Sequence, residues 1–315
     1  MAEFPLRVHD EAILAARPEK NQLDPLRPYE YFVERECGSD RRIRDVATIF
    51  LTNRECPFHC LMCDLWKNTL DATVPDGAIL QQVDYALARL EPAEHVKLYN
   101  SGNFFDRQAI PAGEIPNIAA RLAEFGRVVV ETHPRLCGAA CMRFRDLLAG
   151  ELEIALGLET VHPEVLPRLN KQMTLDDFDR AVVRLRSAGI HVRAFILLRP
   201  PYLSEAEGIH WAIRSMEHAF EVGVQCCTVI PTRAGNGVME QLESAAQFSP
   251  PTIGSLETVH EAGIRLERGR VFVDLWDCER IFSCSRCGPK RKARMHRMNL
   301  EQRVAPPVRC DCCDS

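Results

Sequence analysis

The sequence predicts an α/β protein built on a partial (β/α)6 barrel of the TIM type. Six short apolar or β-branched runs alternate with longer stretches whose apolar residues have helical spacing. The runs are almost continuously apolar, as strands buried in a parallel sheet are. Strand and helix alternating in this way indicate βαβ units, and therefore a parallel sheet that is closed or nearly closed.

The expected elements follow in chain order. The strands are VATIFLT (46–52), HVKLYN (95–100), RVVVE (127–131), LEIALGL (152–158), HVRAFILL (191–198) and VQCCTVI (224–230). The helices are expected at 77–91, 117–125, 174–189 and 206–223. The third helix has Thr174 and Asp177 at its start, the spacing of a capping box, and Gly189 at its end. A further strand, 270–276, would extend or flank the sheet.

These elements define a core from residue 46 to 235. Residues 1–45 are expected to form an N-terminal extension, and residues 236–277 C-terminal helices and a strand. Residues 278–315 form a Cys-rich, basic segment that is too poor in aliphatic side chains to bury much of a core by itself.

Composition and charge narrow the class of protein. The chain has 315 residues, 46% hydrophobic and 26% charged, which is ordinary for a soluble globular protein. It has no apolar run of membrane-spanning length and no signal-peptide pattern at its start. We therefore expect a cytoplasmic protein without membrane contact. Because the cytoplasm is reducing, the 14 cysteines are expected to bind metal and not to form a disulfide framework.

Three cysteines, Cys56, Cys60 and Cys63, stand directly after the first core strand. In parallel αβ barrels, the loops at the carboxyl ends of the strands carry the active site. A [4Fe–4S] cube needs one thiolate for each iron, so three cysteines would leave one iron open to an external ligand. A zinc site that uses His59 as a fourth ligand, or a chance cluster of thiols, is the alternative.

The Cys-x3-Cys-x2-Cys pattern in this place resembles the radical SAM superfamily, and the resemblance covers about residues 46–230. It implies that the open iron binds S-adenosylmethionine. It further implies that one electron, from a flavodoxin- or ferredoxin-type donor, cleaves this cofactor to methionine and a 5′-deoxyadenosyl radical. That radical would then abstract a hydrogen atom from the substrate.

The resemblance also assigns roles to residues outside the cysteine loop. Ser101, Gly102 and Asn103 occupy the Gly-rich turn whose backbone meets the methionine amine in this family. Glu159 stands where the family often bonds the ribose hydroxyls, and Arg193 would pair with the methionine carboxylate. An ordinary strand-to-helix loop, a solvated glutamate and a salt-bridged surface arginine are the corresponding structural alternatives.

One position departs from the commonest pattern of the family. The residue before the third cysteine is often an aromatic that packs on the adenine, and here it is Met62. Because a thioether is polarizable and can pack against a ring, we expect an altered contact at this position and not a lost one.

Several phrases are similar to a subgroup related to the elongator catalytic subunit, and most similar to the radical SAM subunits of archaeosine synthases. They are SGNFFD, VETHP, GLETVHPEVLPRLNK, FILLRPPYLSEAEGIHWAIRSM and QFSPPTIGSLETV. This resemblance implies modification of tRNA or of a 7-deazaguanine-type base, and a partner subunit. A radical SAM enzyme for a small metabolite or a peptide, and a zinc-containing nucleic-acid-binding protein, stay open as alternatives.

The C-terminal segment carries a second cysteine pattern. Cys284-x2-Cys287 and Cys310-x2-Cys313 have the spacing of a tetrahedral zinc site, and binding of the metal could supply folding energy. The further thiols of this segment keep a second iron–sulfur cluster open. The chain carries a net charge of −5, yet the stretch from Arg286 to Arg309 holds eight Lys and Arg residues against one acid, which would suit an RNA backbone.

Overall fold

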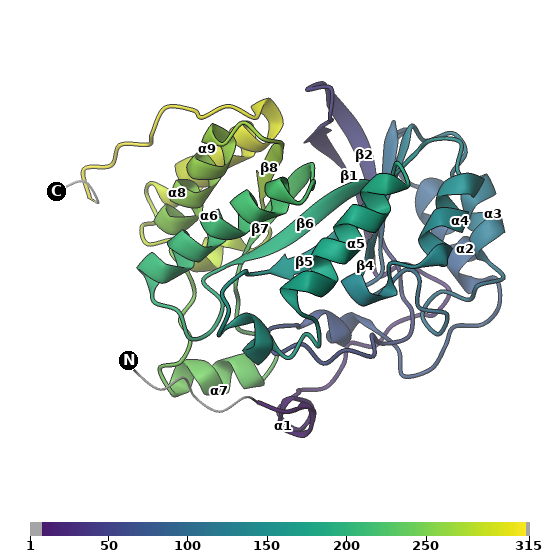
Figure 1. Cartoon of the computed structure of the whole chain (residues 1–315), viewed down its shortest axis with the longest axis horizontal. Coiled ribbons are helices and arrows are strands. Elements are labelled where there is room, and N and C mark those ends of the chain that lie inside the picture. Colours follow the sequence, from purple (N-terminus) through teal and green to yellow (C-terminus); the bar gives the residue numbers. More distant parts are fainter. Residues whose placement is uncertain (1–7, 313–315) are drawn as a thin grey trace.

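The strands form one curled sheet whose convex face is covered by helices (Figure 1). The computed structural model describes residues 8–312. Neighbouring strands follow chain order, β1 to β8. They are β1 (Glu30–Cys37), β2 (Ile43–Phe50), β3 (His95–Tyr99), β4 (Arg127–Thr132), β5 (Glu151–Glu159), β6 (His191–Leu198), β7 (Cys226–Pro231) and β8 (Arg270–Val273).

Strands β2 to β8 are all parallel, which confirms the predicted α/β half-barrel. The N-terminal extension differs from expectation because its residues 30–37 form β1, which pairs antiparallel with β2 over its whole length. The eight residues of β1 pair in register from Glu30 with Phe50 to Cys37 with Ile43. The extension therefore supplies one edge of the sheet and does not lie outside it.

The helices are α1 (Asp10–Ala15), α2 (Ala78–Leu87), α3 (Ile115–Arg121), α4 (Ala139–Leu147), α5 (Leu175–Ser187), α6 (Glu205–Glu221), α7 (Val238–Ser244), α8 (Ile253–Arg265) and α9 (Gly288–Glu301), with short 3₁₀ turns η1 (Leu65–Asn68), η2 (Pro134–Leu136), η3 (Leu166–Leu169) and η4 (Cys278–Ile281). Helices α2 to α6 and α8 lie between strands and cover the convex side, whereas α1 precedes β1, α9 follows β8, and α1 and α7 lie apart from this layer (Figure 1). Helix α5 begins with the predicted capping box, since the Thr174 hydroxyl accepts the Asp177 N–H and the Asp177 carboxylate accepts the Thr174 N–H. None of the helices in the described part of the chain is long and apolar enough to cross a bilayer.

The two faces of the sheet have opposite chemistry because side chains alternate along each strand. The side chains of the convex face are apolar, and Leu98, Val130 and Ile154 are fully buried against the helices. The concave face carries buried charges near the amino ends of the strands, where Glu153 accepts hydrogen bonds from several guanidinium groups. The donors are Arg127 at 3.1 Å, Arg193 at 2.7 Å and Arg270 at 2.7 Å.

The two edges of the sheet approach each other across this ionic layer. Arg270 of β8 donates to the carbonyl of Cys37 at the end of β1, at 3.1 Å. Phe272 packs in one buried cluster with Cys37 and Cys226. The sheet is therefore closed at its amino-terminal pole, and its working face is the opposite pole, where β2 to β8 end.

The C-terminal segment packs against the main core. Helix α9 contacts both β1 and β8, and its Met295 is fully buried in the main core together with Cys278 and Ile281. Arg294 is also buried, and its guanidinium donates to Glu257 at 3.1 Å and to Glu261 at 2.8 Å. The segment is therefore held by the main core and forms no separate core of its own, which agrees with the expectation that it cannot bury much of a core by itself.

Candidate metal and cofactor site

The cysteine loop follows β2 and is held by hydrogen bonds from distant parts of the chain. The Leu61 N–H donates to the Leu169 carbonyl at 2.8 Å. Asn236 donates to the carbonyls of Leu61 at 2.8 Å and Cys63 at 3.0 Å, and the Trp66 indole donates to the same Cys63 carbonyl at 3.0 Å. Because its backbone carbonyls are fixed in this way, the loop presents its three thiols in a defined arrangement.

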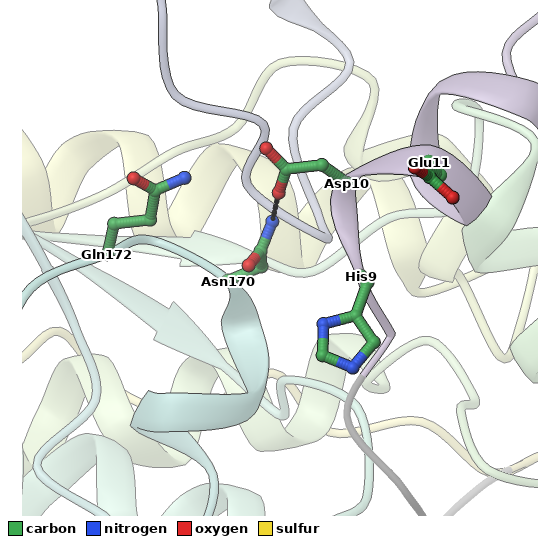
Figure 2. A pocket seen from close by; sticks show the side chains of 5 residues that line it. All are labelled: His9, Asp10, Glu11, Asn170 and Gln172. Carbon is green, nitrogen blue, oxygen red and sulfur yellow. Dashed lines mark hydrogen bonds between the residues drawn. The ribbon is translucent and has the colours of Figure 1, made fainter.

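The N-terminal helix α1 also rests on this loop. The Asp10 carboxylate lies 2.9 Å from the His59 imidazole and accepts a hydrogen bond from Asn170 at 2.6 Å. Asn170 in turn donates to the His59 carbonyl at 2.8 Å. A pocket of about 510 Å³ opens beside these contacts, lined by His9, Asp10, Glu11, Asn170 and Gln172 (Figure 2). The extension thus shields one side of the loop.

The three thiols of Cys56, Cys60 and Cys63 are spread over a wider space than a single ion requires. Within residues 8–312, the only group of three metal-binding side chains with donor atoms all within 4.8 Å of one another is the C-terminal trio. Burial raises the pKa of each of the three loop thiols to about 12. A metal centre here would therefore displace protons as it binds.

The turn after β3 lies directly against the first cysteine. The Asn103 amide donates to the Cys56 sulfur at 3.0 Å, and its oxygen accepts the His133 N–H at 2.6 Å. A Cβ on Gly102 would lie 3.2 Å from the Cys56 Cβ, so only glycine permits this approach without a shift. Ser101 adopts a positive φ of 53°. The structure therefore brings the predicted Gly-rich turn and the cysteine loop together.

Glu131 fixes that turn, and the sequence analysis assigned it no role. Its carboxylate accepts the N–H groups of Asn100 at 2.7 Å and Gly102 at 3.3 Å. Burial raises the pKa of Glu131, although these backbone donors favour its charged form. The turn follows β3 and Glu131 lies on β4, so only the pairing of these two strands brings them together, and the sequence around Glu131 gives no local signal of this role.

Glu159 forms a buried ion pair with Lys171, the second residue that the sequence analysis missed. The Lys171 ammonium lies 2.6 Å from the Glu159 carboxylate, and both side chains are at most 10% exposed. Burial alone would lower the pKa of Lys171, but the Glu159 carboxylate raises it above its ordinary value. A Cβ on Gly157 would come within 2.1 Å of Glu159 and 2.3 Å of Lys171, so the pair lies directly over Gly157 on the concave face of β5.

His133 joins these pieces as a neutral imidazole. Burial lowers its pKa to about 3. Its Nδ1 accepts the Arg135 N–H at 3.2 Å, so its Nε2 carries the proton and donates to the Lys171 carbonyl at 2.9 Å. The ring also stacks on Phe58 of the cysteine loop with centroids 3.9 Å apart. One side chain therefore couples the cysteine loop to the segment that carries Lys171.

Two further predicted residues lie in different places. Met62 packs between two apolar clusters, one containing Ile13 and Leu61 and the other containing Leu169 and Leu197, beside the cysteine loop. Arg193 lies elsewhere, in the ionic layer at the opposite pole. Its three nitrogens donate to Glu153 and Glu36 at 2.6 to 3.1 Å. The expected pairing of Arg193 with a methionine carboxylate is therefore not supported.

The C-terminal segment gathers a second set of thiols. The sulfurs of Cys284, Cys287 and Cys310 lie within 4.8 Å of one another. Cys313, the fourth predicted ligand, lies outside the described residues. The Cys312 sulfur accepts a hydrogen bond from Arg286 at 3.2 Å. Such close thiols suit a single tetrahedral ion.

The donor set around Cys56, Cys60 and Cys63 fits a [4Fe–4S] cluster. The loop offers three thiolates, one for each of three irons of a cube, and an amide donor to the Cys56 sulfur is the kind of contact that tunes such clusters. The fully buried Asn100 also keeps both of its amide atoms without a partner in the described part of the chain. A buried amide without a protein partner next to the turn is a group that a bound polar ligand could satisfy.

Comparison with known proteins gives consistent results. Residues 50–210, just over half of the chain, match the model of the Radical SAM superfamily. An uncharacterised protein of Methanocaldococcus jannaschii is 24% identical over 92% of this chain and 86% of its own length. The archaeosine synthase subunits beta of Methanosarcina acetivorans and Thermococcus kodakarensis are 29% and 28% identical, each over 62% of this chain. The matches span 59% and 63% of those two subunits.

Solved structures show the same fold at low identity. Elp3 of Methanocaldococcus infernus aligns with a TM-score of 0.51 and 15% identity over 71% of this chain and 58% of its own. Methylornithine synthase aligns with a TM-score of 0.50 and 15% identity over 70% of this chain and 64% of its own.

Proposed function

The chain belongs to the radical SAM superfamily, and we propose that it modifies a purine-type base in tRNA, of the 7-deazaguanine class. The family's cofactors are a [4Fe–4S] cluster and S-adenosylmethionine, which together supply a carbon-centred radical that removes a hydrogen atom from the substrate. The observation that carries the proposal is the juxtaposition of the three-cysteine loop with the turn at Gly102 and Asn103, at the carboxyl pole of the barrel.

We assign the residues of this pole as follows. Cys56, Cys60 and Cys63 hold the cluster, and Asn103 donates to the Cys56 sulfur. The turn at Ser101 and Gly102, held from below by Glu131, presents backbone polar groups to the methionine part of the cofactor. Glu159 and Lys171 form a charged pair beside it, Glu159 for the ribose hydroxyls and Lys171 to hold that carboxylate in place. Met62 packs against the adenine.

The choice of tRNA over other substrates has two supports. Two relatives that align with 62% of the chain are named archaeosine synthase subunit beta. Basic side chains of the C-terminal segment, among them Arg286, Lys290 and Arg297, are exposed and could contact phosphates. The word subunit in those names also supports a partner subunit, and a flavodoxin- or ferredoxin-type protein is the expected electron donor.

We further propose that the C-terminal trio binds zinc. Cys284, Cys287 and Cys310 would supply three thiolates, with Cys313 as the fourth by its sequence spacing. A zinc ion there would tie the chain after α9 back to the turn before it. Metal analysis of reconstituted protein tests this: about four irons and one zinc support it, whereas about eight irons without zinc indicate a second cluster.

The tRNA proposal is tested by comparing the modified nucleosides of bulk tRNA from cells with and without the gene. We expect one nucleoside of the 7-deazaguanine class to disappear and its precursor to accumulate. Complementation with the Cys60→Ala variant should leave the precursor unchanged, while the wild-type gene restores the product. Identical nucleoside profiles in all strains would contradict a tRNA substrate and would favour a small metabolite or a peptide.

A further inference from the structure

A continuous row of aromatic rings crosses the concave face of the sheet. Its members are Trp276, Phe32, Phe50, Tyr99 and Phe195, here called the aromatic row. Successive ring centroids lie 6.2 Å apart for Trp276 and Phe32, 6.0 Å for Phe32 and Phe50, 5.8 Å for Phe50 and Tyr99, and 6.3 Å for Tyr99 and Phe195. The last pair joins β3 and β6, which are not neighbours in the sheet, so the row spans the interior of the barrel.

The rings of the row are more exposed than the fully buried aromatic rings of the main core. Phe104, Phe144 and Phe178, which pack in the main core on the convex side, are fully buried at 0% exposure. The four rings of the row that lie on strands are only partly buried, and Trp276 is 57% exposed. Large rings left partly exposed in a continuous set indicate a surface that a ligand covers.

The row lies between the cofactor turn and the ionic layer. On one side, the Tyr29 ring packs on Phe50 at 5.5 Å, and its hydroxyl is 2.8 Å from the Ser101 hydroxyl. On the other side, Lys97 and Arg193 belong to the ionic layer, and each stands two residues before a ring of the row, Tyr99 on β3 and Phe195 on β6. A molecule lying on the row would therefore be next to the turn at Ser101, where the radical is expected to form.

The outer end of the row stands where the two edges of the sheet meet. Trp276 follows β8 and stacks on Phe32 of β1 with an interplanar angle of 15°. The backbone N–H of Trp276 donates to the Asp274 carboxylate at 2.9 Å, which fixes the direction of the chain at this point. Helix α9 contacts both edge strands and carries the exposed cations Lys290 and Arg297.

We propose that the aromatic row is the binding surface for a planar heteroaromatic ring of the substrate, a nucleobase, with Trp276 as its outermost stacking residue. This rests on the proposed tRNA function, because enzymes that act on a base in RNA bind it outside its stack. Stacking on aromatic rings suits every base, and the cations of α9 would hold the neighbouring phosphates. The half-exposed indole that is already stacked on Phe32 extends this stacking surface to the barrel mouth.

The test measures binding, not turnover. The full-length reconstituted protein is titrated with 7-deazaguanosine, with guanosine and with an abasic RNA oligonucleotide, and tryptophan fluorescence is followed. For the variants that lack Trp276, nucleoside binding is measured by equilibrium dialysis and not by fluorescence. The variants are Trp276→Ala, Trp276→Phe and, as a matched control outside the row, Trp211→Phe, whose ring contacts His162 and His210. Thermal melting shows whether each variant is folded.

We expect Trp276→Ala to weaken nucleoside binding by about 5- to 150-fold, the effect of losing roughly 1 to 3 kcal/mol of stacking. Trp276→Phe should restore most of the affinity, Trp211→Phe should bind as wild type, and the abasic RNA should bind equally to all. Should Trp276→Ala be folded and bind nucleosides as wild type does, the proposal is wrong. Where Trp276→Ala is unfolded, the variant Trp66→Phe/Trp211→Phe leaves Trp276 as the reporter: quenching of its fluorescence by nucleosides supports the row, and no quenching overturns the proposal.

The two proposals fail in different ways. If nucleosides bind on the row and no nucleoside of cellular tRNA depends on the gene, the tRNA function fails and the row stands. If the tRNA nucleoside depends on the gene and the affinities for 7-deazaguanosine and guanosine do not change in the Trp276 variants, the proposal of the row as a base-binding surface is wrong and the function stands.

Discussion

Loss of the Lys171 ammonium should destabilise the protein strongly, because it would leave Glu159 charged and unpaired in a buried site. The two groups are 2.6 Å apart and at most 10% exposed. Breaking a buried pair by removing one partner typically costs about 3–5 kcal/mol, since the remaining charge stays desolvated. We therefore expect the Lys171→Met apoprotein to lose about that much free energy of unfolding, measured by urea denaturation.

The double variant Glu159→Gln/Lys171→Met decides whether the pair is the cause. Because the second change removes the stranded charge, we expect the double variant to lose less than the sum of the two single losses, with a coupling energy of roughly 1–3 kcal/mol. Arg180→Met is the matched control: its guanidinium is 60% exposed and pairs only with nearby acids on α5, so about 1 kcal/mol or less should be lost. If the Glu159 and Lys171 effects simply add, the reasoning from burial is refuted.

Three further predictions concern the metal sites and pH. Asn103→Asp replaces the amide that donates to the Cys56 sulfur with an acceptor, and it should lower the cluster's reduction potential by roughly 60–130 mV, equivalent to about 1.5–3 kcal/mol. The exposed control Asn21→Asp should leave the potential unchanged. An unchanged potential of Asn103→Asp in an anaerobic titration would argue against the contact. Cys284→Ser should lose zinc and lower the melting temperature while four irons are retained, and retained zinc would contradict the assignment of the trio. Burial lowers the pKa of His260 to about 3, so below about pH 6.5 the unfolded chain takes up a proton that the folded chain does not. The free energy of unfolding should therefore fall by roughly 1.4 kcal/mol per pH unit because of this side chain as the pH drops from 6.5 to 5. In His260→Phe, this dependence of the unfolding free energy on pH should be smaller by the same amount.

The apolar strands and the cysteine loop could be predicted because their signals are local. A nearly continuous apolar run such as LEIALGL is typical of a strand in a sheet that is buried on both faces. Three cysteines directly after a strand lie at one pole of the barrel. The capping box at Thr174 is local in the same sense, and its helix begins where predicted.

The missed features depend on contacts between distant segments. Strand β1 has mixed, partly exposed side chains, and only its pairing with β2 defines it. Glu131 and Lys171 gain their roles from a turn 29 residues away and a carboxylate 12 residues away, respectively. Arg193 was assigned to the methionine carboxylate from the family resemblance, whereas its position near the start of β6 places it at the closed pole of the barrel, where it binds Glu36 and Glu153.

The central claim is that Cys56, Cys60 and Cys63 hold a cluster with one iron free for S-adenosylmethionine. The most direct measurement is the yield of 5′-deoxyadenosine from anaerobically reconstituted protein supplied with dithionite and S-adenosylmethionine, beside the Cys60→Ala variant. We predict 5′-deoxyadenosine from the wild-type protein and none from the variant. A folded wild-type protein that carries four irons and forms no 5′-deoxyadenosine would contradict the account.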